Sequence, residues 1–182
     1  MAVLHIRKYG DPILRQKAKA VEHFDQQLQT TAADMIETMQ AASGIGLAAN
    51  QVGQAVALCV VDLGLVDEAA KPRAFVNPVI LETKGNSTPH EEGCLSIPEV
   101  TDQVDRPERI RLKFQDLEGT PHEQEFEGMI ARVLQHEIDH LNGLFFIDRL
   151  SPVRRQFHNK KLKEIAAQTQ IELLEEKKKK RA

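Results

Sequence analysis

Residues 128–142, GMIARVLQHEIDHLN, are the stretch around which this chain is expected to fold. Their apolar residues recur at helical spacing, and Gly143 is a typical helix terminator. His136 and His140 are four residues apart, so a helix would separate them by only about 40° around its axis. Two imidazoles on one helix face can bind one ion, which predicts a metal-binding HExxH helix.

The residues beside the two histidines favour a catalytic site over a chance occurrence of a short pattern. Glu137 lies about 100° from His136, near enough to contact a water on the ion without being a ligand. Met129 and Val133 fall within about 60° of His136 and form an apolar stripe. We expect this stripe to line a substrate pocket, although simple core packing of Met129 and Val133 is an equally good interpretation.

A metal centre with two histidines needs at least one more protein ligand. Cys94, in EEGCLS, lies among polar residues and a glycine, and its thiolate would be a strong ligand for Zn²⁺ or Fe²⁺. His158, Glu164 and Glu172 are downstream candidates, but we favour Cys94. Cys59 lies inside the apolar run AVALCVV (55–61) and is expected to be a buried structural thiol.

The rest of the chain indicates an α+β fold with a largely antiparallel sheet. A helix is expected over 25–41, with Asp25 as its N-cap, and a C-terminal helix from about residue 152. Four strands are expected, over 55–63, 74–83, 104–116 and 121–127. Turn-rich segments such as ETKGNSTP (82–89) should separate them. Because the strands cluster between helices, the sheet should be antiparallel and pack around the central HExxH helix.

Length and composition favour one domain with a single core, since 182 residues with 41% hydrophobic content suffice for one. We expect residues 1–150 to form the catalytic part, and 151–182 to extend the same domain as a C-terminal helix and basic tail. The N-terminus MAVLHIRKYG has no apolar stretch long enough for a signal peptide, and no apolar run could span a bilayer. A cytoplasmic protein without membrane contact is therefore expected.

Charge is unevenly distributed along the chain. From Pro152 onward there are ten Lys/Arg and four Asp/Glu, a net of +6, so the remainder carries −9 of the total −3. With no Trp, one Tyr and seven Phe, the chain lacks a base-stacking platform, and we expect no DNA partner. The tail, which ends in KKKKRA (177–182), is either a solvated helix end or a contact for a polyanionic surface such as the ribosome.

GIGLAANQ (44–51) is glycine-punctuated and not periodic. It formally matches the dinucleotide pattern G-x-G-x-x-A, but that pattern follows a strand and opens a helix, whereas here a helix precedes and a strand follows. A loop that lets a substrate backbone approach closely, with Gln51 offering an amide N–H, fits better. A simple helix-to-strand turn is the alternative.

Three segments together, GIGLAANQ (44–51), EGCLS (92–96) and QHEIDH (135–140), resemble the peptide deformylase family in order and separation. Weaker similarity in YGDPILR (9–15) and FVNPVI (75–80) extends the resemblance over roughly residues 1–150. The resemblance implies a metal-dependent hydrolase. Its substrates would be N-formylmethionyl nascent peptides, from which it would release formate.

Position by position, the resemblance implies a set of roles. They are Cys94, His136 and His140 as metal ligands; Glu137 as general acid/base; Gln51 and the backbone N–H of Leu95 as the oxyanion hole; and Ile45 and Gly46 at the border of the bound peptide. The stripe of Met129 and Val133 would then receive the methionine side chain. The implied ion is Fe²⁺, with Zn²⁺, Ni²⁺ or Co²⁺ as possible substitutes.

Two other functions compete with this hypothesis. One is an HExxH metalloprotease with a downstream ligand, and the other is a metal-stabilised ribosome-binding module without catalysis. Arg132 departs from some members of the family, which have an apolar residue at this position of the metal helix.

Overall fold

The computed structural model describes residues 2–179, apart from the side chain of Leu65. Its elements, with η denoting a 3₁₀ helix, are η1 (Pro12–Arg15), α1 (Gln26–Ala41), β1 (Gly46–Ala48), η2 (Ala49–Val52), β2 (Leu58–Val61), η3 (Leu63–Leu65), β3 (Arg73–Cys94), β4 (Ile97–Gln115), β5 (Pro121–Glu127), α2 (Gly128–Leu141), η4 (Phe146–Arg149) and α3 (Pro152–Lys179). Within this range the strands pair antiparallel in chain order, β1 to β5. The predicted α+β class is confirmed.

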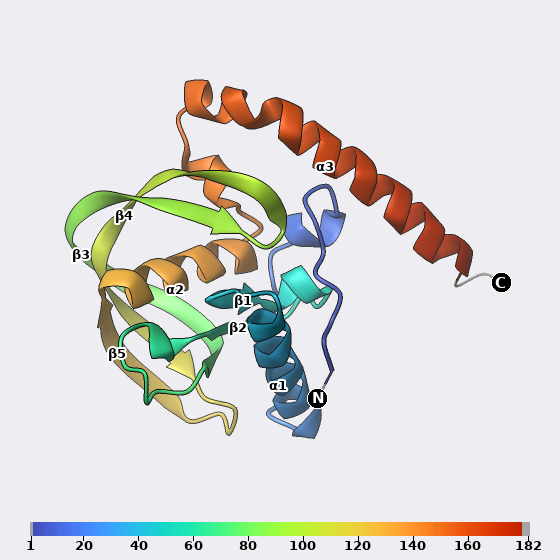
Figure 1. The fold of residues 1–182 in the computed structure, drawn as a ribbon. Coiled ribbons are helices and arrows are strands. Elements are labelled where there is room, and N and C mark those ends of the chain that lie inside the picture. The colour runs from blue at the N-terminus through green and yellow to red at the C-terminus, as the bar shows by residue number, and fades with distance from the viewer. Residues whose placement is uncertain (1, 180–182) are drawn as a thin grey trace.

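Helix α2, which contains HEIDH, lies at the centre of the molecule (Figure 1). Strands β3 and β4 bend over it, and α1 packs on the opposite face of β1 and β2. The side chains of strand β2 show why helices cover both faces of the sheet. Leu58 and Val60 point into the cluster beneath α1, while Cys59 and Val61 point into the cluster beneath α2, as alternation along a strand requires.

The expectation that ETKGNSTP (82–89) separates two strands was wrong. This segment lies inside β3, which pairs with β4 as far as Cys94. The register shifts between Lys84 and Ser87, where Gly85 has a φ of +79°. A bulge with glycine in the left-handed region therefore absorbs the turn-forming residues, and bends the strand instead of ending it. As a result, β3 carries Cys94 to the side of α2.

GIGLAANQ (44–51) is not a loop either. Gly46–Ala48 form β1, which pairs with β2 through Gly46↔Val61 and Ala48↔Cys59. The chain then turns through η2, which carries Gln51. The strand belongs to the sheet because Leu47, Ala48 and Ala49, unlike the residues of a surface loop, are buried between α1 and α2, whereas Ile45 before it is exposed.

The helices predicted over 25–41 and from about residue 152 are confirmed within the described residues. Asp25 caps α1 by accepting a hydrogen bond from the Leu28 N–H at 2.9 Å. Helix α3 begins at Pro152 and projects beyond the body of the molecule (Figure 1). It packs Leu162 and Ile165 against a third apolar cluster that includes Leu14. The predicted tail residues 180–182 lie outside the described range. Within that range, no helix combines the length and apolarity needed to cross a bilayer.

Candidate metal centre and active site

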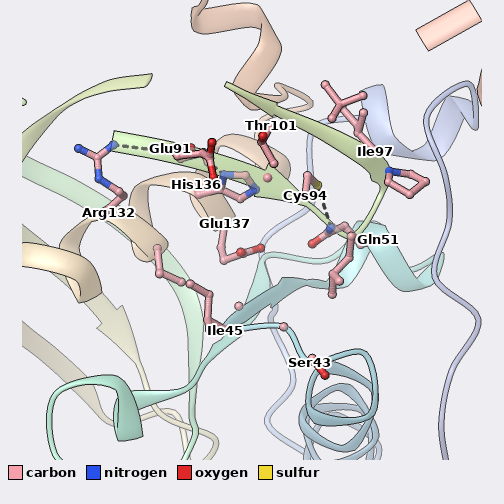
Figure 2. A pocket seen from close by; sticks show the side chains of 18 of the residues that line it. Ser43, Ile45, Gln51, Glu91, Cys94, Ile97, Thr101, Arg132, His136 and Glu137 are labelled. Atoms are coloured by element: carbon pink, nitrogen blue, oxygen red, sulfur yellow. Dashed lines mark hydrogen bonds and ion pairs between the residues drawn. The ribbon is translucent and has the colours of Figure 1, made fainter. Parts of the chain in front are cut away.

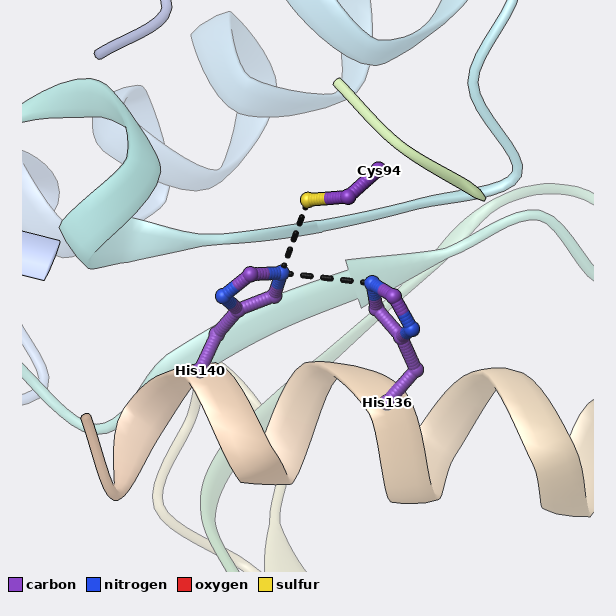
Figure 3. A group of neighbouring side chains, drawn as sticks. All are labelled: Cys94, His136 and His140. Atoms are coloured by element: carbon purple, nitrogen blue, oxygen red, sulfur yellow. Dashed lines mark hydrogen bonds between the residues drawn. The ribbon is translucent and has the colours of Figure 1, made fainter. Parts of the chain in front are cut away.

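Three side chains converge where the end of β3 meets α2 (Figure 3). Cys94 is the last residue of β3, and His136 and His140 stand one turn apart on α2. The His140 Nε2 atom lies 3.1 Å from Cys94 Sγ and 3.2 Å from His136 Nε2. All three ligand atoms lie within 4.8 Å of one another, and no other group in residues 2–179 offers such a set. The geometry thus brings together the three residues selected from the sequence.

The donor set fits a divalent transition-metal ion. A thiolate and two imidazoles suit Zn²⁺ or Fe²⁺, and three protein ligands leave a position open for water. The local charges also favour a cation: although burial opposes it, Cys94 and Glu92 raise the pKa of His136 to about 10. Burial and the His136 charge lower the pKa of His140 well below its usual value. The cluster therefore favours a single positive charge, which one bound ion would supply.

The downstream ligand candidates are not part of this group. His158 lies on α3, where its Nε2 atom is 2.8 Å from Asp102 Oδ2. Glu164 is exposed on the same helix, and Glu172 is half-buried there. None of the three belongs to the cluster of close ligand atoms among the described residues.

Glu92 orients one of the candidate ligands. Its Oε2 atom lies 2.9 Å from His136 Nδ1, so the other ring nitrogen faces the cluster. Burial alone would raise the pKa of this carboxyl, but His136 and Arg106 hold it far below its usual range. Glu92 is therefore a buried carboxylate two residues before Cys94, within the EGCLS segment, to which the sequence interpretation gave no role.

A fully buried arginine ties this carboxylate to α2. Arg106, on β4, donates from Nε to Glu92 Oε1 at 2.6 Å and from Nη1 to Asp139 Oδ2 at 2.8 Å. Arg149 donates to the same Asp139 from outside, with its Nε at 2.6 Å. Side chains of alternating charge thus connect the metal helix α2 to its neighbours: Glu92, Arg106, Asp139 and Arg149. Nothing in the strand sequence VDRPERIRLKF distinguished Arg106 from the exposed charges around it.

Arg132, at which the chain departs from some members of the family, is also buried. Its Nη1 atom donates to Glu92 Oε1 at 2.9 Å and to the Val104 carbonyl at 2.8 Å, and its Nη2 atom donates to the Thr88 carbonyl at 2.7 Å. The guanidinium therefore satisfies backbone carbonyls of both bent strands, and the residue also lines the cavity described below.

Glu137 is buried beside the ligands and faces the cavity (Figure 2). Burial raises its pKa to about 7, although the charges of His136 and Arg106 act in the opposite direction. Its Oε2 atom has no hydrogen-bond partner among the described residues. Gly46 makes room for this carboxyl, because a Cβ there would lie 2.9 Å from the Glu137 carboxyl carbon and 2.7 Å from Val133 Cγ1. Such a group can exchange a proton near neutral pH.

Gln51 and Leu95 both lie next to Cys94, one in space and the other in sequence. The Gln51 Oε1 atom accepts from the Ala48 N–H at 2.8 Å, which leaves the amide nitrogen pointing toward the centre. That Nε2 atom lies 3.1 Å from Ser96 Oγ. It also lies 3.5 Å from Cys94 Sγ, and Figure 2 marks this contact with a dashed line. Leu95 follows Cys94 in the turn between β3 and β4, and both residues line the cavity.

One cavity of about 540 Å³ joins these groups. All but one of the site residues selected from the sequence line it: Ile45, Gly46, Gln51, Cys94, Leu95, Met129, Val133, His136 and Glu137. His140 is the exception, because it is fully buried and does not line the cavity. Val133 belongs to the core cluster beneath α2, Met129 packs against that cluster, and both residues also line the cavity.

Comparisons with known proteins find relatives that match most of the chain. A family model described as "Polypeptide deformylase" matches residues 3–156. A peptide deformylase of Brucella suis is 47% identical over 158 residues, which are 87% of this chain and 90% of that protein. One of Thermotoga maritima is 48% identical over 161 residues, 88% of this chain and 95% of the other.

Solved structures show the same similarity. The crystal structure of a peptide deformylase from Legionella pneumophila has a TM-score of 0.82 and 44% identity, and covers 90% of this chain and 95% of that one. A peptide deformylase from Thermus thermophilus has a TM-score of 0.84 and 41% identity, and covers 92% of this chain and 99% of that one.

Proposed function

The chain belongs to the polypeptide deformylase family, and from that premise we propose how its residues carry out the reaction. The protein is a metal-dependent hydrolase that removes the formyl group from the N-terminal formylmethionine of nascent polypeptides and releases formate. The observation that carries the proposed roles is the convergence of Cys94, His136 and His140 beside a cavity that Glu137 faces.

We assign the ion to the Cys94 thiolate and the Nε2 atoms of His136 and His140. When bound there, the ion supplies a Lewis acid, which makes water more acidic and a carbonyl more electrophilic. Fe²⁺ is the proposed ion, and Zn²⁺, Ni²⁺ or Co²⁺ are substitutes that the same donors accept. Glu92 keeps the His136 ring in place for this role.

Glu137 moves the protons in the proposed reaction. Its unpartnered Oε2 atom accepts a proton from the water that attacks the formyl carbon. The same carboxyl then gives that proton to the amine nitrogen as the C–N bond breaks, so that formate and a free methionyl N-terminus leave. A pKa of about 7 suits both steps, because the group is readily protonated and deprotonated at neutral pH.

Gln51 and the Leu95 N–H stabilise the oxygen that becomes negative during the attack. The hydrogen bond from the Ala48 N–H holds the Gln51 amide in the required orientation before substrate arrives. Ile45 and Gly46 border the peptide backbone, and Met129 and Val133 receive the methionine side chain at the apolar side of the cavity.

Formate release tests this proposal directly. The metal-loaded protein should release formate from a short N-formylmethionyl peptide, and the matched N-acetylmethionyl peptide should be cleaved far more slowly. If the loaded protein releases no formate but cleaves internal peptide bonds, the metalloprotease alternative replaces the proposed roles. If neither reaction occurs and the ion is bound, the non-catalytic alternative gains support.

We also propose that residues 1–150 form the catalytic part and that residues 151–182 are an extension of the same domain. This extension contacts the ribosome in the cytoplasm, where nascent chains emerge. Helix α3 leaves four large apolar side chains exposed: Val153, Phe157, Ile171 and Leu174. Lys177–Lys179 follow at its described end, and contacts of lysines with RNA phosphates should make the binding sensitive to salt.

Deletion from Lys177 tests the ribosome contact. The cut should not include Glu176, because its carboxylate pairs with the Arg7 guanidinium at 2.9 Å. Turnover of a short formyl peptide should be unchanged, while co-sedimentation with ribosomes at low salt should weaken. Equal co-sedimentation of the two proteins would leave the tail as a solvated helix end.

A further inference from the structure

The N-terminal arm, defined here as Arg7–Tyr9, spans the two segments that carry the proposed oxyanion donors. The Arg7 N–H donates to the Gln51 carbonyl at 2.7 Å, and the Tyr9 N–H donates to the Ser96 carbonyl at 2.8 Å. Between them, the Lys8 ammonium donates to the Leu95 carbonyl at 2.6 Å. Three successive residues therefore fix η2 and the turn after β3 relative to each other.

The Lys8 contact continues to the candidate metal ligand. The Leu95 carbonyl and the Ser96 N–H belong to one planar peptide group. The Ser96 N–H donates to Cys94 Sγ at 3.4 Å. A cation at the oxygen end of this peptide polarises it, so the N–H at the other end becomes a stronger donor to the sulfur. Two hydrogen bonds, joined by one peptide group, thus connect the Lys8 ammonium to the Cys94 sulfur.

Lys8 is half-buried, so this contact is only partly screened by water. Burial lowers the pKa of the ammonium, and the charges of Cys94 and Glu172 oppose that shift. Lys8 therefore lies between Cys94 in the active site and Glu172 on α3.

Helix α3 contacts Gly10, the residue that follows the N-terminal arm. The Gln170 Nε2 atom donates to the Gly10 carbonyl at 2.8 Å. Gly10 approaches the helix so closely that a Cβ would lie 2.8 Å from Ala166 Cα. Hydrogen bonds therefore hold the backbone before and after Lys8. The Lys8 side chain is in this way directed at the Leu95 carbonyl.

We propose that Lys8 is a positioning residue of the deformylase site: through the Leu95–Ser96 peptide it fixes the turn that presents the Leu95 N–H and tunes the Cys94 sulfur as a ligand. This inference rests on the proposed roles of Cys94 and Leu95. The proposed role of Lys8 requires both a positive charge and a side chain long enough to contact the Leu95 carbonyl. It predicts an effect on turnover rather than on peptide binding, although Lys8 also lines the cavity.

The test compares Lys8→Met, which keeps the stem without the charge, with Lys8→Arg, which keeps a charged donor. Lys17→Met is the matched control, because Lys17 is exposed on the same N-terminal segment. For Lys8→Met, kcat on a formylmethionyl peptide should fall about tenfold while KM changes less than about twofold, as expected for loss of one charge-assisted hydrogen bond. Lys8→Arg should restore most of kcat, and Lys17→Met should behave like the unmodified protein.

The Co²⁺-loaded proteins give a second readout, which does not depend on turnover. The thiolate-to-Co²⁺ charge-transfer absorption should shift in Lys8→Met and stay in place in Lys17→Met. An unshifted band together with unchanged kcat would overturn the proposal, and so would a loss carried by KM, which would make Lys8 a direct peptide contact. Failure of the unmodified protein to release formate would instead overturn the proposed roles, while the cobalt band would still test the link from Lys8 to Cys94.

Discussion

The Glu92 Oε2 atom lies 2.9 Å from His136 Nδ1, so a carboxylate at the end of β3 holds a candidate metal ligand on α2. The same carboxylate accepts hydrogen bonds from two buried arginines, Arg106 and Arg132. A residue that is not one of the three clustered ligands therefore connects the metal centre to the charges that hold the sheet against the helix.

Glu92→Gln is predicted to weaken metal binding by about ten- to a hundredfold, because an amide lacks the charge that orients His136. Titration of the metal-free protein against a competing chelator measures this. Glu91→Gln is the matched control, since the neighbouring Glu91 is exposed and should leave affinity unchanged. An affinity of folded Glu92→Gln within about twofold of the original would show that the carboxylate does not support the ligand.

Arg106→Met is predicted to lower the free energy of unfolding by about 3–5 kcal/mol, because it leaves the Glu92 and Asp139 carboxylates buried without their shared partner. Denaturant unfolding of the metal-free protein checks the change without a contribution from the ion. Lys161→Met, which removes an exposed pair with Glu99, should have no measurable effect. Similar midpoints for both variants would contradict the proposed role of Arg106.

The metal helix was predictable from sequence because its two histidines and its apolar spacing are local signals. Arg106 was not, since burial of one arginine among several charged strand residues depends on partners 14 and 33 positions away. The lengths of β3 and β4 were underestimated for a related reason. Glycine at 85 and the polar residues after it form a bulge in one register and a turn in another, and only the pairing with β4 decides between them.

Glu137→Gln is predicted to reduce kcat at least about a hundredfold while the ion stays bound, because the amide cannot accept the proton of the attacking water. Metal content and formate release are measured on the same preparation, so that loss of the ion is not mistaken for loss of the base. Near-normal turnover of the loaded variant would remove Glu137 from the proposed mechanism.

If the ion is Fe²⁺, activity is predicted to decay in air, because ferrous iron on a thiolate is readily oxidised and the Cys94 sulfur can be oxidised with it. Protein purified without oxygen should lose activity on exposure to air, and reconstitution with Ni²⁺ should give stable turnover. A zinc form that is fully active as purified and stable in air would contradict the assignment of iron.

The metal content of Cys94→Ser tests most directly whether Cys94, His136 and His140 hold the ion. Cys59→Ala is the control: that thiol is fully buried, and burial raises its pKa well above the usual value, so it should remain protonated and contribute nothing to the site. The unmodified protein and Cys59→Ala should each carry one ion per chain after purification without oxygen, while folded Cys94→Ser should lose most of it. If Cys94→Ser retained one ion per chain with unchanged affinity, the third ligand would lie elsewhere and the proposed metal centre would be wrong.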